Sequence, residues 1–499
     1  MNRGLSLEPR RLGREIAARA RRVPVAAWVC AAVAVLNAVS WSFITPPFAV
    51  SDEPSHFAYV KQLAESHALP SSHTFGFSLE EIRVLQALHE FPDAVLPATG
   101  AISSRAEQRK LDQELAATAK LPREGSPAAG VATSEPPLYY SLEAIPYTIA
   151  FHASLLTRLQ LMRLLSALFA GLTAMFAFLF VREALPGRRA VWPACGLAVA
   201  FIPVLGFVSG AVNPDSLLFA ISAMSFWALA RAFRRGLTHR RAALIGVIAA
   251  AGLLTKVNFA GLFPGIILGL GVLALRTPRT SRPGAYRAFA IGAVIASSPI
   301  LLYALSNLAA GRSTLGVVSN GVSLVTARGS IFSAISYIWQ FFLPRLPGMK
   351  AYDPGIFTTR QFWFNGLVGQ FGWRETVFPA WVYDLAGIAG IVVLGALLRT
   401  LILLRSTLRE RLAELLVYGV IAVGLLVLVG GASYVDPPTE AYNEVRYLLP
   451  LLALLAASLG LAMRAAGRRW EAALGATVVL ALIADDIFSQ LLVIARFYG

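Results

Sequence analysis

Two adjacent carboxylates and a histidine follow directly on the first apolar stretch of the chain. The segment "PPFAVSDEPSHFAYVKQL" spans residues 46–63 and contains Asp52, Glu53 and His56. A carboxylate within hydrogen-bond reach of a hydroxyl can accept its proton, and a second carboxylate alongside can raise the pKa of the first. We therefore treat Asp52 and Glu53 as candidate catalytic residues and His56 as a candidate binding residue.

Each of these residues also has a purely structural interpretation. Asp52 can cap the helix that Pro54 opens, and Glu53 can interact favourably with the first turn of that helix. His56 shares its loop with carboxylates and with three further histidines, namely His67, His73 and His89. Their spacing is not that of a tight metal site, so surface histidines are the alternative.

Four further charged residues stand beside apolar stretches. They are Asp215 in "NPDSLL", Lys256 in "LLTKVNF", Arg374 in "FGWRE" and Arg446 in "EVRYLLP". Asp215 is a natural helix cap, and Lys256 can extend its ammonium group to the membrane surface. Arg374 and Arg446 can each pair with an adjacent acid. These structural interpretations compete with the binding roles given below.

The composition assigns the chain to the polytopic membrane proteins. Hydrophobic residues make up 56% and charged residues 14% of 499 residues, which a polar shell in water cannot cover. A bilayer core of ~30 Å requires ~20 apolar residues of helix. We therefore predict an all-α fold with about eleven transmembrane helices. The predicted spans are 24–44, 160–181, 191–209, 216–233, 242–256, 258–275, 288–308, 379–398, 412–432, 447–463 and 471–486.

Arginines set the predicted orientation, because short basic loops are retained in the cytoplasm. Seven arginines precede the first span, and further clusters fall at 182–189, 231–241, 276–287, 399–411 and 464–469. All of them lie on one side only if segment 138–153 lies along the membrane surface instead of crossing it. The formal charge of +16 is then a topology signal and does not indicate nucleic-acid binding.

Three segments on the outer side are too long to be turns, namely 45–158, 309–378 and 433–446. In the first, "SDEPSHFAYVKQLAESH" predicts a short helix. The sequence "SLEEIRVLQALHEF" predicts an amphipathic helix with an apolar face of Ile82, Leu85, Leu88 and Phe91. The predicted division is an arginine-rich cytoplasmic N-terminus (1–23), an N-terminal membrane module (24–308), the second outer loop (309–378) and a C-terminal membrane module (379–499).

An aromatic run in the second outer loop is expected at the membrane interface, where such side chains gather. It could also stack against a sugar or a prenyl chain. The run consists of Phe362, Trp363, Phe364, Phe371 and Trp373.

The order of these motifs resembles the N-terminal module of GT-C membrane glycosyltransferases. The shared features are a first span, "PP" and an acidic pair opening a juxtamembrane helix, the interfacial "EPPLYYSLEAIPY" and the span "RLLSALFAGLTAMFAFLFVREAL". The closer likeness is to a bacterial family of predicted membrane proteins of unknown function, family 2142. Its marks here are "DEPSHFAYVKQLAESHALP", "EPPLYY", "NPDSLLFAISAMSFWALAR", "FWFNGLVGQFGW" and "EVRYLLPLLALL", and the likeness covers most of the chain.

The resemblance implies a glycosyltransferase that acts on the outer side of the bacterial cytoplasmic membrane. It would transfer a sugar from a polyprenyl-phosphate donor to a cell-envelope glycan or glycolipid, with inversion. Asp52 would be the general base for the acceptor hydroxyl. Glu53 would raise the pKa of Asp52 or orient the acceptor. Many GT-C enzymes end in a sizeable outer domain, whereas a short tail follows Asp485 and Asp486 here, so the outer loops would have to bind the acceptor.

The remaining residues would bind the donor. Lys256, followed by Arg374 and Arg446, would stabilise the departing polyprenyl phosphate. Asp215 would bind the donor or a metal ion. No cofactor is certain, and a divalent metal ion is left open.

Two other functions are compatible with the sequence. A transporter or flippase of lipid-linked glycans would use charged groups or broken helices near the middle of the membrane. The predicted spans carry their charges near their ends, and Asp485 and Asp486 are expected at the outer surface. A non-catalytic scaffold of a cell-envelope complex is the third interpretation.

Overall fold

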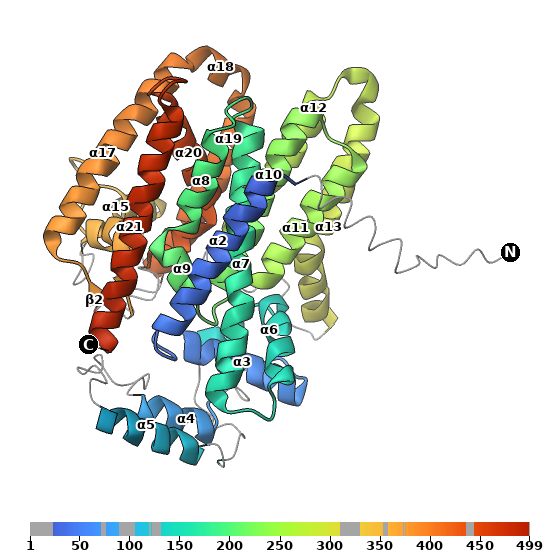
Figure 1. Cartoon of the computed structure of the whole chain (residues 1–499). Helices are drawn as coiled ribbons and strands as arrows, with labels where there is room; N and C mark the ends of the chain where they lie inside the picture. The colour runs from blue at the N-terminus through green and yellow to red at the C-terminus, as the bar shows by residue number, and fades with distance from the viewer. Residues whose placement is uncertain are drawn as a thin grey trace.

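The computed structural model describes residues 23–70, 76–88, 105–118, 121, 131–309, 330–352, 358–372, 374, 376–435 and 444–498. These residues form a bundle of long helices with a group of shorter helices at one end (Figure 1). The only strands among them, β1 (Gln370–Phe371) and β2 (Thr376–Val377), make one antiparallel pair. The predicted all-α membrane fold is confirmed, whereas the arginine-rich residues 1–22 lie outside the described part.

Nine helical segments among the described residues are long and apolar enough to cross a membrane. They are α2 (Val25–Ile44), α7 (Leu155–Ala184), α10 (Asp215–Arg235), η2 with α12 (Val257–Gly261 and Phe263–Arg276), η3 with α13 (Arg279–Ser281 and Arg282–Ala309), α17 (Ala380–Leu403), α19 (Leu412–Val435), η5 with α20 (Val445–Leu451 and Leu452–Arg464) and α21 (Glu471–Phe497).

Two of the eleven predicted spans differ from these nine. Segment 191–209 forms α8 (Val191–Ala200) and α9 (Pro203–Ser209), which meet at a bend of 53° and make at most one broken span. Segment 242–256 forms α11 (His239–Thr255), which has 17 residues and is therefore about 26 Å long. The chain turns into extended backbone at Lys256, so α11 is shorter than the ~30 Å of a bilayer core.

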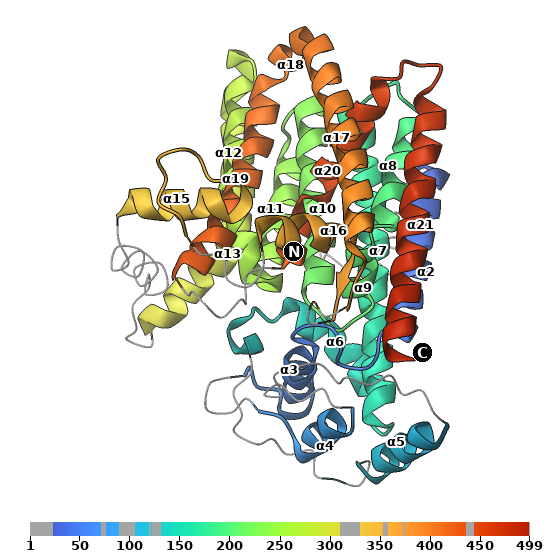
Figure 2. The same cartoon turned by 90° about the vertical axis from the view of Figure 1, so that its left-hand side faces the viewer.

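The shorter helices belong mainly to the segments that the sequence predicts on the outer side. They are α3 (Glu53–Ser66), α4 (Leu79–Ala87), α5 (Arg105–Thr118), η1 (Val131–Ser134), α6 (Leu138–Ile149), α15 (Ile331–Phe342), the π-helical turn η4 (Gln361–Asn365), α16 (Gly366–Gly369) and, in a turn between long helices, α18 (Arg405–Glu410). At about 18 Å, α6 is too short to cross a membrane, as predicted for segment 138–153. Figure 2 shows α15 lying across the direction of the long helices. Its side chain Phe332 is 83% exposed.

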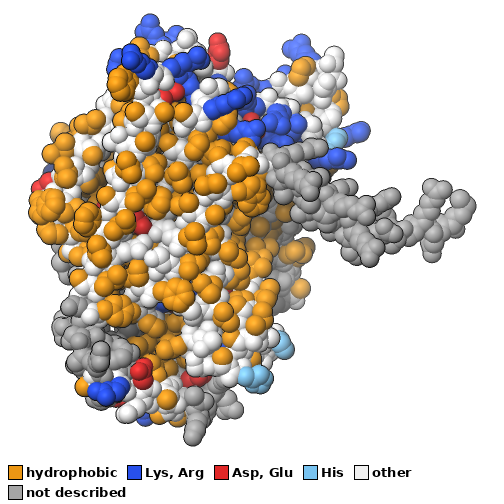
Figure 3. All heavy atoms as spheres, in the orientation of Figure 1, with side chains coloured by type: hydrophobic (Ala, Val, Ile, Leu, Met, Phe, Trp, Pro, Cys, Tyr) orange, Lys and Arg blue, Asp and Glu red, His pale blue; other side chains and the backbone are white. Residues whose placement is uncertain are grey.

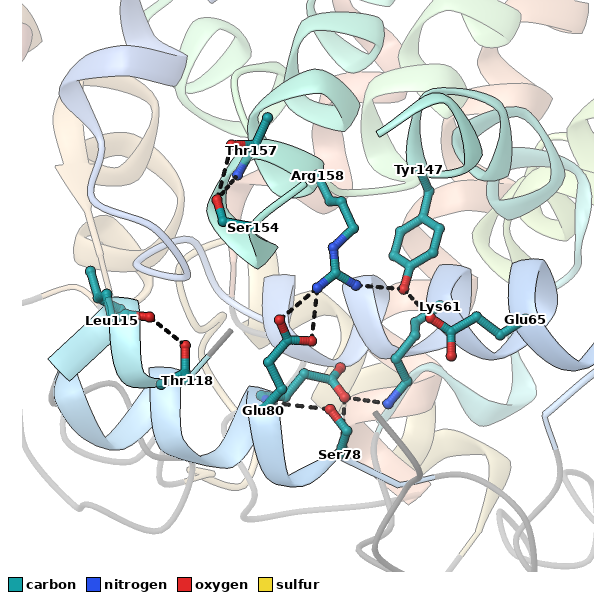
Figure 4. Close-up of polar contacts among 11 residues, drawn as sticks. Lys61, Glu65, Ser78, Glu80, Leu115, Thr118, Tyr147, Ser154, Thr157 and Arg158 are labelled. Carbon is teal, nitrogen blue, oxygen red and sulfur yellow. Dashed lines mark hydrogen bonds and ion pairs between the residues drawn. The ribbon is translucent and has the colours of Figure 1, made fainter. Parts of the chain in front are cut away.

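Buried ion pairs and hydrogen bonds join α3, α4, α6 and the start of α7 (Figure 4). Arg158, at the start of α7, donates two hydrogen bonds of 2.7 Å to the Glu80 carboxylate of α4 and one of 2.7 Å to Tyr147 of α6. Lys61 of α3 pairs with Glu81, again on α4. Because one partner left alone would be a buried, uncompensated charge, these pairs fix how α3, α4 and α6 sit on α7.

The helix that "SLEEIRVLQALHEF" predicts is present as α4, but its buried face differs from the prediction. Ser78 and Glu81 form a reciprocal capping box at its start. Both Glu80 and Glu81 are buried together with Val84 and Leu85, because each acid meets a cation from another helix. Phe91 lies outside the described residues.

Helix α9 packs tightly against α2 and so places the connection to α10 beside the end of α2. A Cβ atom on Gly206 would lie 2.3 Å from Trp41 Cδ1, so no side chain fits between the two helices. Phe371 is fully buried against Trp41, with ring centroids 4.9 Å apart. Phe362 is buried as well, so these two members of the aromatic run pack inside the protein and are not an interface belt. Trp373 lies outside the described residues.

Helix α21 continues well beyond the acidic pair near its middle. Asp486 is buried, and it accepts hydrogen bonds of 2.9 Å from Trp41 Nε1 and 3.0 Å from Gln490 Nε2. The helix extends roughly 16 Å further to Phe497. Asp486 is therefore buried against the last turns of α2, whereas the neighbouring Asp485 is half-buried.

Arginine side chains gather at one end of the bundle, as the positive-inside pattern predicts (Figure 3). Helix α10 links the two ends, because it begins at Asp215 and ends at Arg234 and Arg235. We call the end with these arginines the arginine-rich face; the helices α3, α4 and α6 lie at the opposite end (Figure 1).

Cysteine labelling in intact cells tests the predicted orientation. Ser141 in α6 and Thr280 in η3 are both exposed, and the native Cys30 and Cys195 are buried. A membrane-impermeant maleimide should label Ser141→Cys and leave Thr280→Cys unlabelled until the membrane is opened. Labelling of Thr280→Cys in intact cells would contradict the orientation.

Candidate functional site

Glu53 is buried in a complete set of hydrogen bonds at the start of α3. Arg163 of α7 donates from Nε to Oε1 (2.7 Å) and from Nη2 to Oε2 (2.5 Å). The backbone N–H groups of Phe48 and Val212 donate to Oε2 and Oε1, both at 2.9 Å. A carboxylate has about four acceptor sites, and all of them are used here. The geometry favours a positioning role for Glu53 over the predicted catalytic one.

Arg163 also explains the Pro46–Pro47 break that follows α2. Its guanidinium donates to the carbonyl oxygens of Ser42 (3.1 Å), Thr45 (2.9 Å) and Pro46 (2.9 Å). These carbonyls lie where α2 ends, and helix ends leave such groups without an intrahelical partner. Arg163 therefore fixes the exit from α2, while its ion pair with Glu53 fixes the entry to α3.

Asp52, the neighbour of Glu53, points in another direction. Its backbone lies in the left-handed region (φ 69°), and its side chain makes no capping hydrogen bond to α3. Instead, Oδ2 lies 2.5 Å from Nη2 of Arg446, and the side chain keeps 25% of its surface exposed. The helix-cap interpretation of Asp52 is therefore wrong, and this carboxylate is accessible at the surface of the protein.

Arg446 joins Asp52 to a row of alternating charges. Its Nε lies 2.7 Å from Glu444 and 3.7 Å from Oδ2 of Asp215. The same oxygen of Asp215 lies 2.9 Å from Nζ of Lys256. We call these five residues, Asp52, Asp215, Lys256, Glu444 and Arg446, the charged cluster; it assembles the starts of α3, α10 and η5 with the end of α11.

The structural alternatives for Lys256 and Asp215 do not hold. Lys256 is buried, so its ammonium group does not extend to a membrane surface. Asp215 is the first residue of α10 and does not cap it; Asn213 accepts a hydrogen bond from the Asp215 N–H through its own side chain. Both charges are buried beside each other because each compensates the other.

The two accessible acids of the charged cluster have opposite pKa shifts. Burial raises the pKa of Asp52, but the positive charge of Arg446, with a further contribution from Lys256, outweighs it and holds the pKa below its usual range. Burial raises the pKa of Glu444. The positive charge of Arg446 lowers it and the negative charge of Asp52 raises it, and the net shift is upward. Asp52 is therefore ionised at neutral pH, and Glu444 takes up a proton more readily.

Arg374 and Arg446 line one pocket beside the charged cluster. The wall also includes Ser51, next to Asp52, as well as Glu444 and residues of α9 such as Phe207. Arg374 has a left-handed backbone (φ 72°), and its guanidinium carbon lies 5.1 Å from the ring centre of Phe362. Glu375, the acid expected to pair with Arg374, lies outside the described residues, whereas the expected pairing of Arg446 with Glu444 is confirmed.

His56 is buried and electrically neutral. Its Nδ1 lies 2.9 Å from the Tyr140 hydroxyl, and its Nε2 has no hydrogen-bond partner within the described part of the chain. Burial lowers the pKa of His56 to about 3, despite the opposing effect of Asp52. The interpretation of His56 as a surface histidine is wrong; His67 is exposed, and His73 and His89 lie outside the described residues.

Burial of neutral His56 should make the fold sensitive to acid. The unfolded chain takes up this proton near pH 6.5 and the folded chain only near pH 3, so the stability from neutral His56 is lost progressively between these values. We expect the melting temperature to fall less between pH 7 and pH 4.5 in His56→Gln than in the parent. His67→Asn, at an exposed left-handed position of the same helix, should behave like the parent. Equal acid sensitivity of parent and His56→Gln would contradict this assignment.

Three residues were not predicted as site residues from the sequence, although Glu444 was expected as the ion-pair partner of Arg446. Glu444 pairs with Arg446; Glu135 accepts the N–H of Val257 (3.3 Å); and the Tyr447 ring lies under Lys256 and Arg446, 5.3 and 5.1 Å from its centre. The motifs "EPPLYY" and "EVRYLLP" contain all three and were the available signal. Burial raises the pKa of Glu135, against the effect of Lys256.

A metal ion does not fit the arrangement of these acids. Where the structure describes the chain, no group of three or more His, Cys, Asp or Glu side chains is placed to hold one. The acids of the charged cluster face Lys256 and Arg446 instead.

Comparison with known proteins places the chain in a family. The model of the family DUF2142, described as "Predicted membrane protein", matches residues 35–455. No curated protein and no solved structure matches the chain. Because the match covers most of the chain, including the whole charged cluster, the protein belongs to the DUF2142 family of predicted membrane proteins.

Proposed function

We propose that this protein is a GT-C-like membrane glycosyltransferase that takes a sugar from a polyprenyl-phosphate donor. The observation that carries the proposal is the position of Asp52, whose partly exposed carboxylate lies 2.5 Å from Arg446, a buried cation that lines a pocket. An acid that can accept a proton and cations that can hold a phosphate are the two groups this reaction requires. The acceptor is a glycan or glycolipid of the bacterial cell envelope, on the outer side of the cytoplasmic membrane.

The proposed reaction is a single displacement with inversion. The acceptor oxygen forms a bond to the anomeric carbon of the sugar, and Asp52 takes the proton of that hydroxyl. The bond between the anomeric carbon and the phosphate oxygen breaks, and polyprenyl phosphate leaves with the electron pair. Lys256 and Arg446 stabilise the charge that develops on this phosphate. Asp215 holds the Lys256 ammonium group in place.

Donor binding would strengthen Asp52 as a base. In the free protein, Arg446 keeps the pKa of Asp52 low, and a carboxylate of low pKa is a weak base. A phosphate bound to Arg446 and Lys256 adds negative charge beside Asp52 and weakens their effect on it, so the pKa of Asp52 rises. Glu444, whose pKa burial already raises, can take up a proton as the phosphate arrives. The carboxylate would thus become effective when a donor is present.

Transfer by the purified protein from a panel of labelled polyprenyl-phosphate sugars to cell-envelope acceptors tests the proposal. Within this assay, Lys256→Met should slow transfer strongly, because one cation is lost from a desolvated phosphate site. Lys61→Met is the matched control, since Lys61 is also a buried lysine paired with a carboxylate, but lies in the ion-pair network of α3 and α4. Both variants lose a buried ion pair, so unequal transfer per folded molecule separates catalysis from stability. Equal transfer would leave Lys256 with a structural role alone.

One observation favours the second candidate, a transporter or flippase of lipid-linked glycans. Helices α8 and α9 meet at a bend of 53° and together are long and apolar enough for one broken span, and residues of α9 line the pocket beside the charged cluster. Asp486 offers less support, because Trp41 and Gln490 satisfy both of its oxygens. The two functions differ in whether the bond between sugar and phosphate breaks.

A further inference from the structure

A second pocket opens on the arginine-rich face, at the far end of α10 from the charged cluster. Three connections between helices form it: the link from α10 to α11, the end of α12, and the turn at α18 and α19. Its volume is about 400 Å³. Its charged lining residues are Arg234, Arg276, Arg411, Glu410 and Glu414.

Two of these arginines are held by the protein, and one is not. Arg411 donates to both oxygens of Glu414 (2.9 Å each) and to the Ala184 carbonyl (2.6 Å). Arg234 donates to the Glu183 carbonyl at 2.9 Å. Arg276, in the last turn of α12, is exposed and has no hydrogen-bond or ion-pair partner among the described residues. Among the described residues, the guanidinium groups of Arg234 and Arg411 are therefore fixed by protein partners, and that of Arg276 is available to a ligand.

The other wall of the pocket is apolar. Phe233, Leu237 and Leu273 line it, and Leu275 next to Arg276 is 58% exposed. A free inorganic anion would gain nothing from these side chains. A phosphate attached to a glycerol backbone and acyl chains would contact the arginines with its headgroup and the apolar wall with its first methylene groups.

We propose that this pocket binds the phosphate headgroup of an anionic phospholipid. Arg276 supplies the free guanidinium, whose planar set of donors matches a phosphate. Basic pockets between helices on the cytoplasmic side of a membrane are suited to such headgroups, and the sequence predicts that the arginine-rich face lies on that side. The site is independent of the proposed transferase, because it lies at the opposite end of the bundle.

The test measures the melting temperature of the full-length protein in mixed micelles with increasing phosphatidylglycerol. We expect phosphatidylglycerol to raise the melting temperature, and Arg276→Gln to weaken the apparent affinity about tenfold, the usual scale for one charged hydrogen bond. Arg276→Lys should retain part of the affinity, because it keeps the charge but loses the planar donors. Arg287→Gln, which removes an exposed arginine of α13 outside the pocket, is the matched control and should bind as the parent does.

Two further probes identify the source of the phosphate. Zwitterionic phosphatidylcholine and inorganic phosphate at the same concentrations should each leave the melting temperature unchanged. An equal effect of inorganic phosphate would overturn the lipid assignment in favour of a soluble anion. The absence of any phosphatidylglycerol effect, or the same affinity in Arg276→Gln and Arg287→Gln, would overturn the site itself.

Discussion

Replacing Glu53 by glutamine is expected to destabilise the fold by about 3 to 5 kcal/mol, the usual cost of leaving one partner of a buried ion pair alone. Arg163 would stay buried without its counter-ion. Glutamine would also bring an NH₂ group toward N–H donors of the arginine and of the backbone at Phe48 or Val212. Unfolding of the purified protein by a titrated denaturing detergent measures the change.

The ion pair between Arg360 and Asp384 is the matched control for this substitution. Its shortest distance is 2.5 Å, the same as that of Glu53 with Arg163, but both of its side chains are more than half exposed. Asp384→Asn should therefore change the stability by no more than about 1 kcal/mol. If Glu53→Gln were as mild as Asp384→Asn, the positioning role assigned to Glu53 would be wrong.

Asp52→Asn should reduce sugar transfer by roughly 10²-fold or more, the usual scale for losing a general base. Asparagine has nearly the same shape and is one of the few residues that adopt a left-handed backbone readily, so the φ of 69° is retained. Because Asp52 makes no capping hydrogen bond, the change does not remove a helix cap. The protein should therefore fold, and the loss should appear in turnover.

Glu444→Gln distinguishes proton transfer from electrostatic support of Arg446. Both acids pair with this arginine, and their side chains are similarly exposed, 25% for Asp52 and 21% for Glu444. If both carboxylates only hold Arg446 in place, the two variants should slow transfer to a similar extent. If Asp52 is the base, Glu444→Gln should be the milder variant by at least tenfold.

Most of the fold is predictable because the signals that define it are local. The length of the apolar stretches identifies the long helices. The capping box of Ser78 and Glu81 marks the start of α4. The predicted count of spans differs from the structure where the chain turns inside an apolar region, as at Lys256. There the composition is continuous, and only the backbone conformation ends the helix.

The sequence does not show that Glu53 is buried in an ion pair while Asp52 stays partly exposed. Asp52 has a left-handed backbone just before α3 begins at Glu53, so the two adjacent acids point in different directions: Glu53 is fully buried, and Asp52 stays partly exposed beside Arg446. Which of the two is buried depends on Arg163, a residue 110 positions away that the sequence shows only as one arginine at the start of a span. The pairing of Lys256 with Asp215 likewise joins two helices, and no local pattern reveals it.

The most direct test follows both halves of a donor through the reaction in proteoliposomes. A polyprenyl-phosphate sugar carries ³H in the sugar and ³²P in the phosphate, and cell-envelope acceptors are supplied on the outer face. The glycosyltransferase proposal predicts that ³H moves to the acceptor while ³²P stays with polyprenyl phosphate, and that Asp52→Asn slows this separation by roughly 10²-fold. Movement of the donor across the bilayer with both labels still joined, or separation at the same rate in Asp52→Asn, would contradict it.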